Sequence, residues 1–445
     1  MTKIVIVGAG SGFGGRLSVD IMANPRLREG SIWLVDLNPG RLQKVYDYVR
    51  RTVEKYNLPT QVQATTDRCE ALPDADFVVT SIAVGGGAYW GHPFNAEVSI
   101  PREYGVDQSV ADTVSVGAVF RFLRTAPVQV QILRDVERLA PNALVLNHTN
   151  PMAMLTWVHH AATKVRNVGL CHGVQGTNGV LARKLGLPPG ETRYLCAGIN
   201  HLAWFLEYKH GGRDLYPELR AMLDDPEKIK GEEVRFEIMR HFGYFPTESN
   251  RHDSEYMPYF RRTAELRDYY HLDQRELTDV PRERDWLKDS GGAGEESLPV
   301  GDINRTSNEF TIHIMDAILS DVPYRFNGNV MNHGLIGNLP DGCCVEVPCM
   351  TDSHGINPCH VGNLPAQLAA LNRAHIGVQE LAVQAVLEKN REAAYHAVCL
   401  CPMTAASVPL PKIREMFDRL WEAEKELLLH FDPNHTGPVP ETCAP

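Results

Sequence analysis

In its first 195 residues the chain alternates short apolar runs with stretches of helical periodicity. A continuous run of apolar, β-branched residues is typical of a strand buried on both faces of a parallel sheet. Such runs occupy Lys3–Gly8, Ser31–Asp36, Gln61–Thr65, Asp76–Ala83, Ala143–Asn147, Val168–Leu170 and Tyr194–Ile199. Helical spacing marks Arg16–Ala23, Arg41–Tyr56 and Val114–Leu139. This alternation predicts an α/β fold with an N-terminal Rossmann-like, doubly wound parallel sheet.

The pattern changes after residue 195. Residues Ala197–Tyr208 alternate as an antiparallel strand does, and strand-like runs recur within Pro323–Cys349. The charged stretch 224–294 is predicted to be helical or looped, and helical periodicity covers Asn308–Ile318, Ala366–Asn390 and Ala405–His430. We therefore predict two domains, a doubly wound domain at residues 1–195 and a C-terminal mixed α+β domain at residues 196–445, with the site at their interface.

Composition excludes several classes of partner. The 445-residue chain has a formal net charge of -11, so it lacks the basic excess that nonspecific nucleic-acid binding requires. No apolar run approaches the roughly 20 residues that span a bilayer. The start MTKIVIVGAG passes directly into a predicted strand, so we expect no signal peptide. Ten cysteines without a compact framework fit a reducing compartment, and we expect a cytoplasmic protein with no membrane contact.

A glycine-rich turn lies between the first predicted strand and the first predicted helix. Its candidate cofactor-binding residues are Gly8, Gly10, Ser11, Gly12 and Phe13. Glycines let the backbone approach a pyrophosphate, and a helix N-terminus offers free N–H groups and a positive dipole. Strand, turn and helix in this order predict a dinucleotide site. Phe13 replaces the third glycine of G-x-G-x-x-G, so an ordinary glycine-rich turn remains an alternative.

Two later positions extend the predicted dinucleotide site. Asp36 ends the second predicted strand, where a carboxylate accepts hydrogen bonds from the ribose of NAD and repels the 2′-phosphate of NADP. A surface aspartate at a strand end is the simpler alternative. Gly85 begins a run of three glycines after a buried strand, where the backbone can lie close to a nicotinamide. Together these positions predict NAD as the cofactor.

Two predicted strands are each followed by a pair of polar residues. Cys171 and His172 follow one strand, and Asn200 and His201 follow the other. Because α/β sheets bind ligands outside the carboxyl ends of their strands, a thiolate and an imidazole brought together there are suitable ligands for a divalent metal. A buried structural cysteine and a hydrogen-bonded structural histidine are the alternative.

A second group of potential metal ligands lies late in the chain. Its members are Cys343, Cys344, Cys349, His354, Cys359 and His360. Their spacings lack paired C-x-x-C ligands, and adjacent side chains on a strand point to opposite faces. We therefore do not expect a structural zinc site in this segment.

Nine longer motifs carry a family resemblance. They are GAGS at Gly8–Ser11, DADFVV at Asp74–Val79, RFLRT at Arg121–Thr125, NHTNPMAM at Asn147–Met154, VGLCHGVQGT at Val168–Thr177, AGINHLAWF at Ala197–Phe205, YFPTESNRHDSEYMPYF at Tyr244–Phe260, NGNVMNHGLIGNLPDGCCVEVPC at Asn327–Cys349 and GNLPAQLAALNRA at Gly362–Ala374. Together they resemble glycoside hydrolase family 4, the NAD- and divalent-metal-dependent glycosidases. The resemblance covers nearly the whole chain and is far more specific than the glycine turn.

Within that family the CHGVQGT and GCCVEVPC stretches look most like the α-galactosidase branch. The resemblance therefore implies a small-molecule α-galactoside as substrate. The Cys171-His172 pair also occurs in branches acting on α-glucosides and α-hexuronides, so these sugars remain alternatives. The run Ser115-Val116-Gly117-Ala118 replaces a more glycine-rich run expected before Arg121, in a loop that lies near the sugar in family members.

The resemblance also implies an unusual mechanism. Tightly held NAD⁺ takes hydride from C3 of the sugar, a base removes the C2 proton, the glycosidic oxygen leaves by elimination, water adds, and the hydride returns. A divalent metal, usually Mn²⁺, bridges the C2 and C3 oxygens. Its implied protein ligands are Cys171 and His201, and Asn147 is implied to touch the cofactor. The net reaction is hydrolysis without net redox.

The remaining roles come from the same resemblance. The base is Tyr256 or Asp253, and we favour Tyr256 because a metal-polarised substrate lets a phenol act as base. His172 is a proton donor to the departing oxygen or a substrate contact. Asn150 and Asn200 are implied to contact substrate hydroxyls. Family members are commonly dimers or tetramers, which implies a homo-oligomer.

One alternative comes from a different class of enzyme. A NAD-dependent 2-hydroxy acid dehydrogenase of the malate or lactate type would have a similar first domain. It would need an Arg–His–Asp set for its substrate and would accumulate NADH on turnover. A noncatalytic NAD-sensing protein is a third possibility, and the polar residues at several successive strand ends argue against it.

Overall fold

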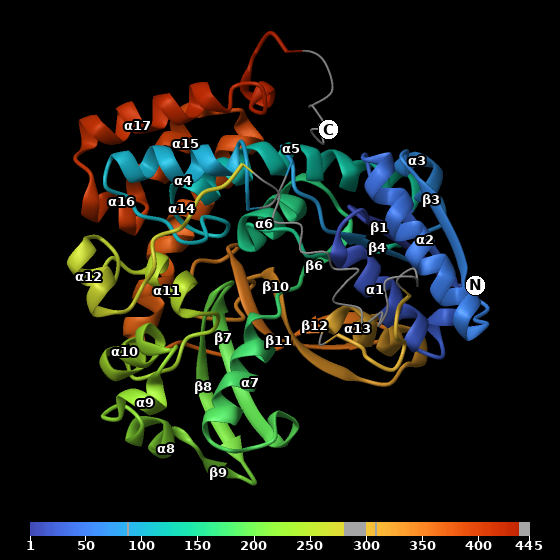
Figure 1. The fold of residues 1–445 in the computed structure, drawn as a ribbon, viewed down its shortest axis with the longest axis horizontal. Coiled ribbons are helices and arrows are strands. Elements are labelled where there is room, and N and C mark those ends of the chain that lie inside the picture. The colour runs from blue at the N-terminus through green and yellow to red at the C-terminus, as the bar shows by residue number, and fades with distance from the viewer. Residues whose placement is uncertain (87–88, 280–299, 308, 436–445) are drawn as a thin grey trace.

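In the part of the chain that the structure describes, twelve strands form one mixed sheet (Figure 1). The strands follow the order β3-β2-β1-β4-β5-β6-β10-β11-β7-β8-β9, with β12 paired to β11. The computed structural model describes residues 1–86, 89–279, 300–307 and 309–435, so residues 280–294 and 308 of the predicted C-terminal segments lie outside it. Within the described ranges, no helix is both long and apolar enough to cross a bilayer.

Six parallel strands form the N-terminal half of the sheet. They are β1 (Lys3–Val7), β2 (Ser31–Val35), β3 (Gln61–Thr65), β4 (Phe77–Thr80), β5 (Leu144–Asn147) and β6 (Arg166–Gly169). Their order, 3-2-1-4-5-6, is that of a doubly wound dinucleotide-binding fold, and the order reverses between β1 and β4. The predicted Rossmann-like parallel sheet is therefore confirmed. Ligands bind such sheets outside the carboxyl ends of the strands, at the reversal.

Seven helices connect and follow these strands. They are α1 (Gly12–Ala23), α2 (Pro39–Tyr56), α3 (Arg68–Ala71), α4 (Phe94–Glu103), α5 (Ser115–Leu139), α6 (Met152–Ala162) and α7 (Gly173–Lys184), with a 3-10 turn, η1 (Leu27–Glu29), before β2. Helix α2 begins after an Asn38 cap with Pro39 at its first position, where a missing N–H costs nothing. Helix α5 is buried along most of its length because C-terminal helices cover its outer side (Figure 1).

The C-terminal half of the sheet is antiparallel. Its strands are β7 (Thr192–Ile199), which follows the 3-10 turn η2 (Pro189–Glu191), β8 (Leu202–His210), β9 (Arg213–Asp214), β10 (Tyr324–Met331), β11 (Cys344–Asp352) and β12 (Gly355–Pro358). One row of residues crosses from the parallel half: Gly169 pairs with Asn329, Asn329 with Glu346, and Glu346 with Gly198. The sheet therefore continues from β6 through β10 and β11 to β7 without an edge between the two halves.

The other helices cover this half and return to the first. They are α8 (Tyr216–Ala221), α9 (Pro226–Ile229), α10 (Glu233–Phe242), α11 (Asn250–Tyr256), α12 (Ala264–Tyr269), α13 (Phe310–Ser320), α14 (Ala366–Glu388), α15 (Arg391–Leu400), α16 (Pro402–Ser407) and α17 (Leu410–Ala423), followed by a 3-10 turn, η3 (Leu429–Phe431). Helices α14, α15 and α17 share one apolar core with α5 and α6 (Figure 1). Sheet and core thus join residues on both sides of position 195, and the domain boundary placed there stays a prediction.

Two predicted helices differ from the observed ones. The predicted helix at Arg16–Ala23 begins four residues earlier, because the glycine turn itself enters α1 with Ser11 as its cap. The helical segment predicted at Ala405–His430 consists of more than one helix. Its first part belongs to α16 and its second to α17, and the break falls at Val408, which precedes Pro409. A residue before proline is disfavoured in the helical conformation, which explains the break.

Candidate active site

The turn between β1 and α1 brings its backbone close to two neighbouring strands. Gly8 has a φ of 88°, and a Cβ there would lie 2.0 Å from the carbonyl oxygen of Ser81. The N–H of Gly10 donates a hydrogen bond of 2.8 Å to Oδ2 of Asp36. A Cβ at Gly10 would lie 2.7 Å from the same carboxylate. Both glycines are therefore required by the packing of the chain, and Asp36 lies directly against the turn.

Gly14, in the first turn of α1, is a residue that the sequence analysis missed. A Cβ at this position would lie 2.3 Å from the carbonyl oxygen of Ala9, so only glycine lets α1 pack this closely on the turn. Close helix packing is the role of the third glycine in the dinucleotide fingerprint. The structure places that role at Gly14, one residue beyond Phe13. The signal in the sequence is the spacing of Gly8, Gly10 and Gly14.

The other predicted cofactor residues lie around the same turn or at neighbouring strand ends. Ser11 caps α1, whose first residue is Gly12, by accepting a hydrogen bond of 3.4 Å from the N–H of Gly14. The ring of Phe13 lies 4.6 Å from that of His148, which follows β5. Gly85 has a φ of 86° and follows β4.

Asn147, at the end of β5, is engaged by its own neighbours. Its side-chain oxygen accepts hydrogen bonds of 2.8 Å from Oγ1 of Thr80 and 3.1 Å from the N–H of Thr149. Its amide nitrogen donates to the carbonyl of Thr149 at 3.1 Å. Asn147 therefore ties together the ends of β4 and β5, beside the crevice. Its predicted contact with the cofactor stays a prediction.

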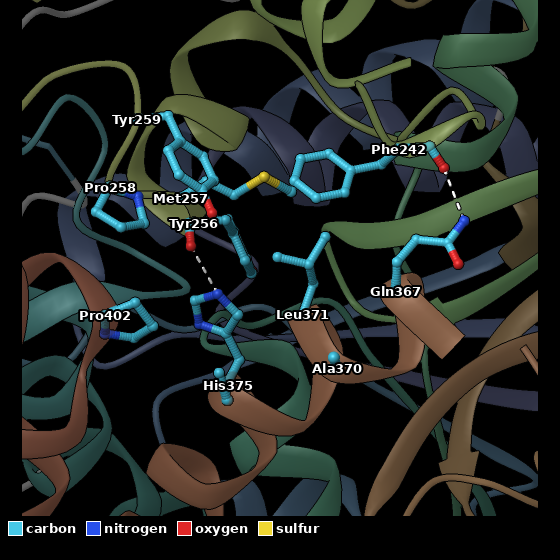
Figure 2. A pocket seen from close by; sticks show the side chains of 11 residues that line it. Phe242, Tyr256, Met257, Pro258, Tyr259, Gln367, Ala370, Leu371, His375 and Pro402 are labelled. Atoms are coloured by element: carbon cyan, nitrogen blue, oxygen red, sulfur yellow. Dashed lines mark hydrogen bonds between the residues drawn. The ribbon is translucent and has the colours of Figure 1, made fainter. Parts of the chain in front are cut away.

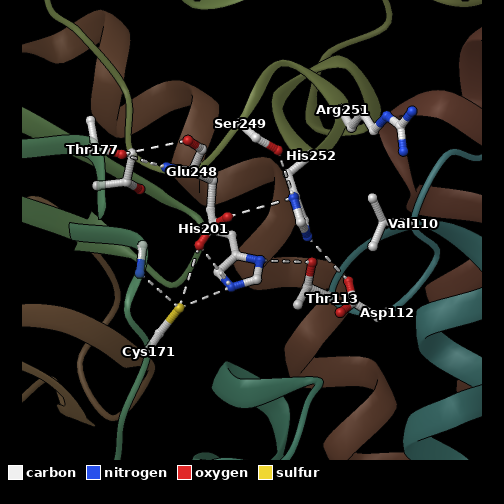
Figure 3. A network of polar contacts seen from close by, with 12 residues as sticks. Val110, Asp112, Thr113, Cys171, Thr177, His201, Glu248, Ser249, Arg251 and His252 are labelled. Atoms are coloured by element: carbon white, nitrogen blue, oxygen red, sulfur yellow. Dashed lines mark hydrogen bonds and ion pairs between the residues drawn. The ribbon is translucent and has the colours of Figure 1, made fainter. Parts of the chain in front are cut away.

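The two predicted metal ligands, Cys171 and His201, meet. Sγ of Cys171 lies 3.1 Å from Nε2 of His201, and both residues are buried (Figure 3). Cys171 follows the parallel strand β6, so its predicted place at the carboxyl end of a parallel strand is correct. The same prediction is wrong for His201, because β7 is antiparallel to β11 and β8, and His201 occupies the turn of the β7–β8 hairpin with a φ of 62°.

Glu248, which the sequence analysis missed, joins this pair. Its Oε1 lies 3.4 Å from Sγ of Cys171 and 3.3 Å from Nε2 of His201, and Figure 3 shows the three side chains pointing toward one another. On the opposite side of the imidazole, Nδ1 of His201 lies 3.2 Å from Oγ1 of Thr113. A thiol, an imidazole and a carboxylate form a donor set that suits a divalent transition metal.

His252 and Asp112 extend the network away from the thiol. Nδ1 of His252 lies 3.5 Å from Oε2 of Glu248, and Nε2 lies 3.5 Å from Oδ1 of Asp112. Oδ2 of Asp112 accepts hydrogen bonds of 2.8 Å from the phenol of Tyr89 and 3.1 Å from the amide of Asn150. The predicted substrate residue Asn150 is therefore connected to the Cys171–His201 pair through Asp112, His252 and Glu248.

The electrostatics of the pair depend on burial. Burial lowers the pKa of His201 to about 4, so its imidazole is neutral and able to coordinate a metal near neutral pH. Burial and the nearby Glu248 raise the pKa of the Cys171 thiol well above its ordinary value. A bound cation reverses that effect, because coordination deprotonates a thiol. The N–H of Gly173, at the start of α7, already donates a hydrogen bond of 3.3 Å to the sulfur.

Asp112 and His252 form an ion pair. Burial works against a charged Asp112, but the hydrogen bond and charge of His252 outweigh it and lower the pKa of Asp112. Burial likewise opposes a charged His252, but its hydrogen bond to Asp112 raises the pKa of His252 to about 9. Near neutral pH the pair is therefore a carboxylate and an imidazolium.

The two candidate bases, Tyr256 and Asp253, are both enclosed. The phenol of Tyr256 donates a hydrogen bond of 3.0 Å to the carbonyl oxygen of Asn200, the residue before His201. Neither carboxyl oxygen of Asp253 has a hydrogen-bond partner among the described residues. Burial raises the pKa of both groups well above their ordinary values. Tyr256 thus touches the hairpin turn that carries His201.

The remaining predicted residues differ in exposure. The amide of Asn200 is buried, and within the described part of the chain neither its oxygen nor its nitrogen has a hydrogen-bond partner. A buried amide without partners is able to bind a ligand's polar groups. The side chain of His172 is 73% exposed, with Nδ1 3.7 Å from Oε1 of Glu309. His172 is therefore accessible but is not part of the buried network.

A separate pocket of about 320 Å³ lies on the other side of Tyr256 (Figure 2). It is lined mainly by apolar side chains, including Phe242, Met257 and Leu371. Nε2 of His375 donates a hydrogen bond of 2.8 Å to the carbonyl oxygen of Tyr256. Tyr256 lines this pocket and also contacts the hairpin turn that carries His201. This pocket lacks the charged groups that the described chemistry requires.

The late cysteines lie elsewhere. Cys343, Cys344 and Cys349 are buried at and along β11. Among the described residues, the groups of ligand atoms close enough for one metal ion contain none of these cysteines. The one such group in this segment is Asp321, Asp352 and His354, which is largely exposed.

Comparison with known proteins gives matches along nearly the whole chain. The model of the Family 4 glycosyl hydrolase matches residues 3–187, and that of the Family 4 glycosyl hydrolase C-terminal domain matches residues 196–404. An alpha-galactosidase of Bacillus subtilis (strain 168) is 38% identical over 440 residues, covering 97% of this chain and 100% of that protein. An alpha-galactosidase of Rhizobium meliloti (strain 1021) is 35% identical over 443 residues, covering 96% and 89%.

A solved structure shares the fold. The 6-phospho-beta glucosidase from Thermotoga maritima, in complex with manganese, NAD+ and glucose-6-phosphate, superimposes with a TM-score of 0.78. The match covers 96% of this chain and 99% of that chain at 19% identity. At that identity the likeness concerns the fold, and it includes both halves of the continuous sheet.

Proposed function

Because this chain belongs to glycosyl hydrolase family 4, we propose that it hydrolyses α-galactosides with NAD⁺ and a divalent metal ion, Mn²⁺ in the first instance, as cofactors. The observation that carries the proposal is the contact of 3.1 Å between Sγ of Cys171 and Nε2 of His201. These residues stand in the two family motifs that carry the metal ligands. The dehydrogenase alternative is abandoned, since both halves of the chain match a glycosidase family.

The residues present fit a divalent metal. Ligand bonds of roughly 2.0–2.3 Å place neighbouring donor atoms about 3.0–3.7 Å apart, and the Cys171–His201 separation falls in that range. The neutral imidazole of His201 is ready to coordinate, and the buried thiol of Cys171 is a site that a cation would deprotonate. Cys171 and His201 are therefore the proposed protein ligands.

The residues present also fit NAD. Helix α1 directs its N-terminus at the glycine turn, and Asp36 lies against that turn where a ribose would be bound. Gly8 and Gly14 permit the tight backbone path by which a pyrophosphate approaches. We propose Gly8, Gly10, Gly12 and Asp36 as the principal contacts, with Ser11, Phe13, Gly85 and Asn147 around them.

The chain's own residues then have distinct tasks. When bound, the two cofactors supply a hydride acceptor for C3 of the sugar and polarisation of the C2 and C3 oxygens. Tyr256, as the phenolate left after its O–H proton has passed to solvent, takes the C2 proton on its oxygen, and Asp253, as the carboxylate, is the alternative base. The exposed imidazole of His172 gives a proton to the departing glycosidic oxygen. The amides of Asn150 and Asn200 orient the sugar hydroxyls.

A panel of p-nitrophenyl glycosides tests this proposal. We expect release from the α-galactoside only when NAD⁺ and Mn²⁺ are both present, with no NADH accumulating at steady state. Cys171→Ser should abolish the activity, whereas Cys69→Ser, which changes an exposed thiol, should not. Release that needs neither cofactor, or NADH formation from a 2-hydroxy acid, would refute the assignment.

The same panel decides the sugar. The α-glucoside, the α-glucuronide and the α-galacturonide are the alternatives, because the Cys171-His172 pair is shared by the branches that act on them. The run Ser115–Ala118 begins α5 and is buried. Because it departs from the glycine-rich pattern of the α-galactosidase branch, the other sugars remain alternative substrates. A preference of about tenfold or more for one glycoside would settle the substrate class.

We also infer a cytoplasmic location and a homo-oligomer. Nine cysteines lie among the described residues, and all nine are free, which suits a reducing compartment. Leu400 and Leu410, on or near the C-terminal helices, expose 58% and 66% of their surface, as residues at a subunit contact do in the monomer. Light scattering coupled to size exclusion distinguishes a dimer or tetramer from a monomer.

A further inference from the structure

The backbone of Glu248 adopts a conformation that side chains rarely occupy. Its φ is 78°, in the left-handed region where a Cβ is unfavourable. Strain of this kind persists where the surrounding structure requires it and is concentrated at functional sites. His201, a proposed metal ligand, is also in the left-handed region, with a φ of 62°. Glu248 therefore shares an unusual backbone feature with a ligand that it contacts.

The surroundings hold Glu248 in this position. Its N–H donates a hydrogen bond of 3.1 Å to Oγ1 of Thr177, and its carbonyl oxygen accepts from the guanidinium of Arg235. Gly173 makes room for the carboxylate, because a Cβ at Gly173 would lie 2.2 Å from Oε1 of Glu248. Contacts on the backbone and a missing Cβ thus fix one placement of the side chain.

That placement points Oε1 at both proposed ligands. Oε1 lies 3.4 Å from Sγ of Cys171 and 3.3 Å from Nε2 of His201, and the sulfur and nitrogen are 3.1 Å apart. Three donor atoms with nearly equal separations of this size surround a single point at coordination distance. We propose that Glu248 is the third protein ligand of the divalent ion, an inference that rests on the proposed metal-dependent function.

The second carboxylate oxygen is held by a positioning pair. Oε2 lies 3.5 Å from Nδ1 of His252, whose Nε2 lies 3.5 Å from Oδ1 of Asp112 (Figure 3). A carboxylate that coordinates a metal through one oxygen is commonly oriented by a partner on the other. With three protein ligands the ion binds before the sugar arrives and keeps open positions for the substrate oxygens.

Metal titration of the apoenzyme, without sugar or NAD⁺, tests this inference. The probe is Co²⁺, whose charge-transfer absorption reports the cysteine sulfur and whose ligand-field bands report the number of ligands. We expect Glu248→Gln to weaken Co²⁺ binding by about 10- to 100-fold and to change the ligand-field bands while the sulfur band remains. Glu309→Gln, at a carboxylate beside His172 that does not face the sulfur, is the matched control and should bind like wild type.

A second variant changes none of the three proposed ligand residues. Gly173→Ala should also weaken binding, because the added Cβ occupies the space of Oε1. Co²⁺ affinities of Glu248→Gln and Gly173→Ala within twofold of wild type, with unchanged bands, would overturn the inference while leaving the metal site intact. If wild type and Cys171→Ser bind Co²⁺ equally weakly, the proposed metal-dependent function fails instead.

Discussion

The phenolic oxygen of Tyr256 lies 3.0 Å from the backbone carbonyl oxygen of Asn200. This hydrogen bond joins the end of α11 to the turn of the β7–β8 hairpin, one residue before His201. A base must lie within reach of the proton that it removes, so a group anchored beside the proposed metal ligand His201 is well placed. Asp253, three residues earlier on the same helix, has no such anchor among the described residues.

Paired substitutions separate these two candidate bases. We expect Tyr256→Phe to lower kcat by about 10²–10⁴-fold, because it removes the proton acceptor and leaves the ring in place. Asp253→Asn should lower kcat by less than about tenfold, since the amide has nearly the same shape. The readout is kcat on the α-galactoside, together with the isotope effect of deuterium at C2. A larger loss in Asp253→Asn than in Tyr256→Phe would assign the proton transfer to the carboxylate.

Gly14 provides a test of the cofactor site. Gly14→Ala adds a Cβ 2.3 Å from the carbonyl oxygen of Ala9, so α1 must move away from the glycine turn. We expect the dissociation constant for NAD⁺ to rise by at least about tenfold, because the turn and the helix N-terminus no longer face the pyrophosphate together.

The matched control is Gly176→Ala in α7, where a Cβ meets nothing within 4 Å. This change should leave NAD⁺ binding unaltered and raise stability slightly, by roughly 0.5–1 kcal/mol, because alanine is the better helix former. Calorimetric titration with NAD⁺ gives both affinities. Equal affinity in Gly14→Ala and wild type would show that the turn does not bind the cofactor.

Arg124 supports the segment that follows β4. Its Nε lies 2.9 Å from Oε1 of Glu97, both side chains are almost fully buried, and its guanidinium also donates to the carbonyl of Val84. Arg124→Met would leave Glu97 buried without its partner, which costs about 3–5 kcal/mol of the free energy of unfolding.

The exposed pair of Arg26 and Asp316, at 3.2 Å, provides the comparison. Arg26→Met should cost no more than about 1 kcal/mol, because solvent screens this pair. Urea unfolding of both variants measures the difference. If the two variants were equally stable, the buried pair would contribute no more than a surface pair.

His159 on α6 makes stability depend on pH. It is buried, neither ring nitrogen has a partner among the described residues, and burial lowers its pKa from 6.5 to about 3. The unfolded chain therefore binds a proton that the folded chain does not bind between these values, so stability falls as the pH drops below about 6.5.

We expect this histidine to cost wild type about 2 kcal/mol of the free energy of unfolding between about pH 7 and about pH 5. His159→Leu, which has no titrating group, should lack that part of the loss. Urea unfolding of the two proteins at both pH values isolates the effect, since every other group is common to them. Parallel losses in the two proteins would mean that folding does not lower the pKa of His159.

Local patterns in the sequence were sufficient to predict much of the fold. The apolar runs and helical spacing located all six parallel strands, and the glycine turn and Asp36 proved to be in contact. These features depend on residues close in sequence or on a repeating period. Helical spacing also marked Ala405–His430 as helical, and Pro409 divides that segment between α16 and α17.

The sequence by itself therefore determined the doubly wound sheet, the family and two metal-ligand candidates, because motif spacing and hydrophobic period are local properties. Only the tertiary structure placed Glu248, 77 residues from Cys171, against the thiol, and linked it through His252 to Asp112. The hydrophobic periodicity of a segment does not specify which loops contact one another across a sheet. Their meeting follows from the continuation of the sheet through β10 and β11 to β7, a pairing between segments far apart in sequence.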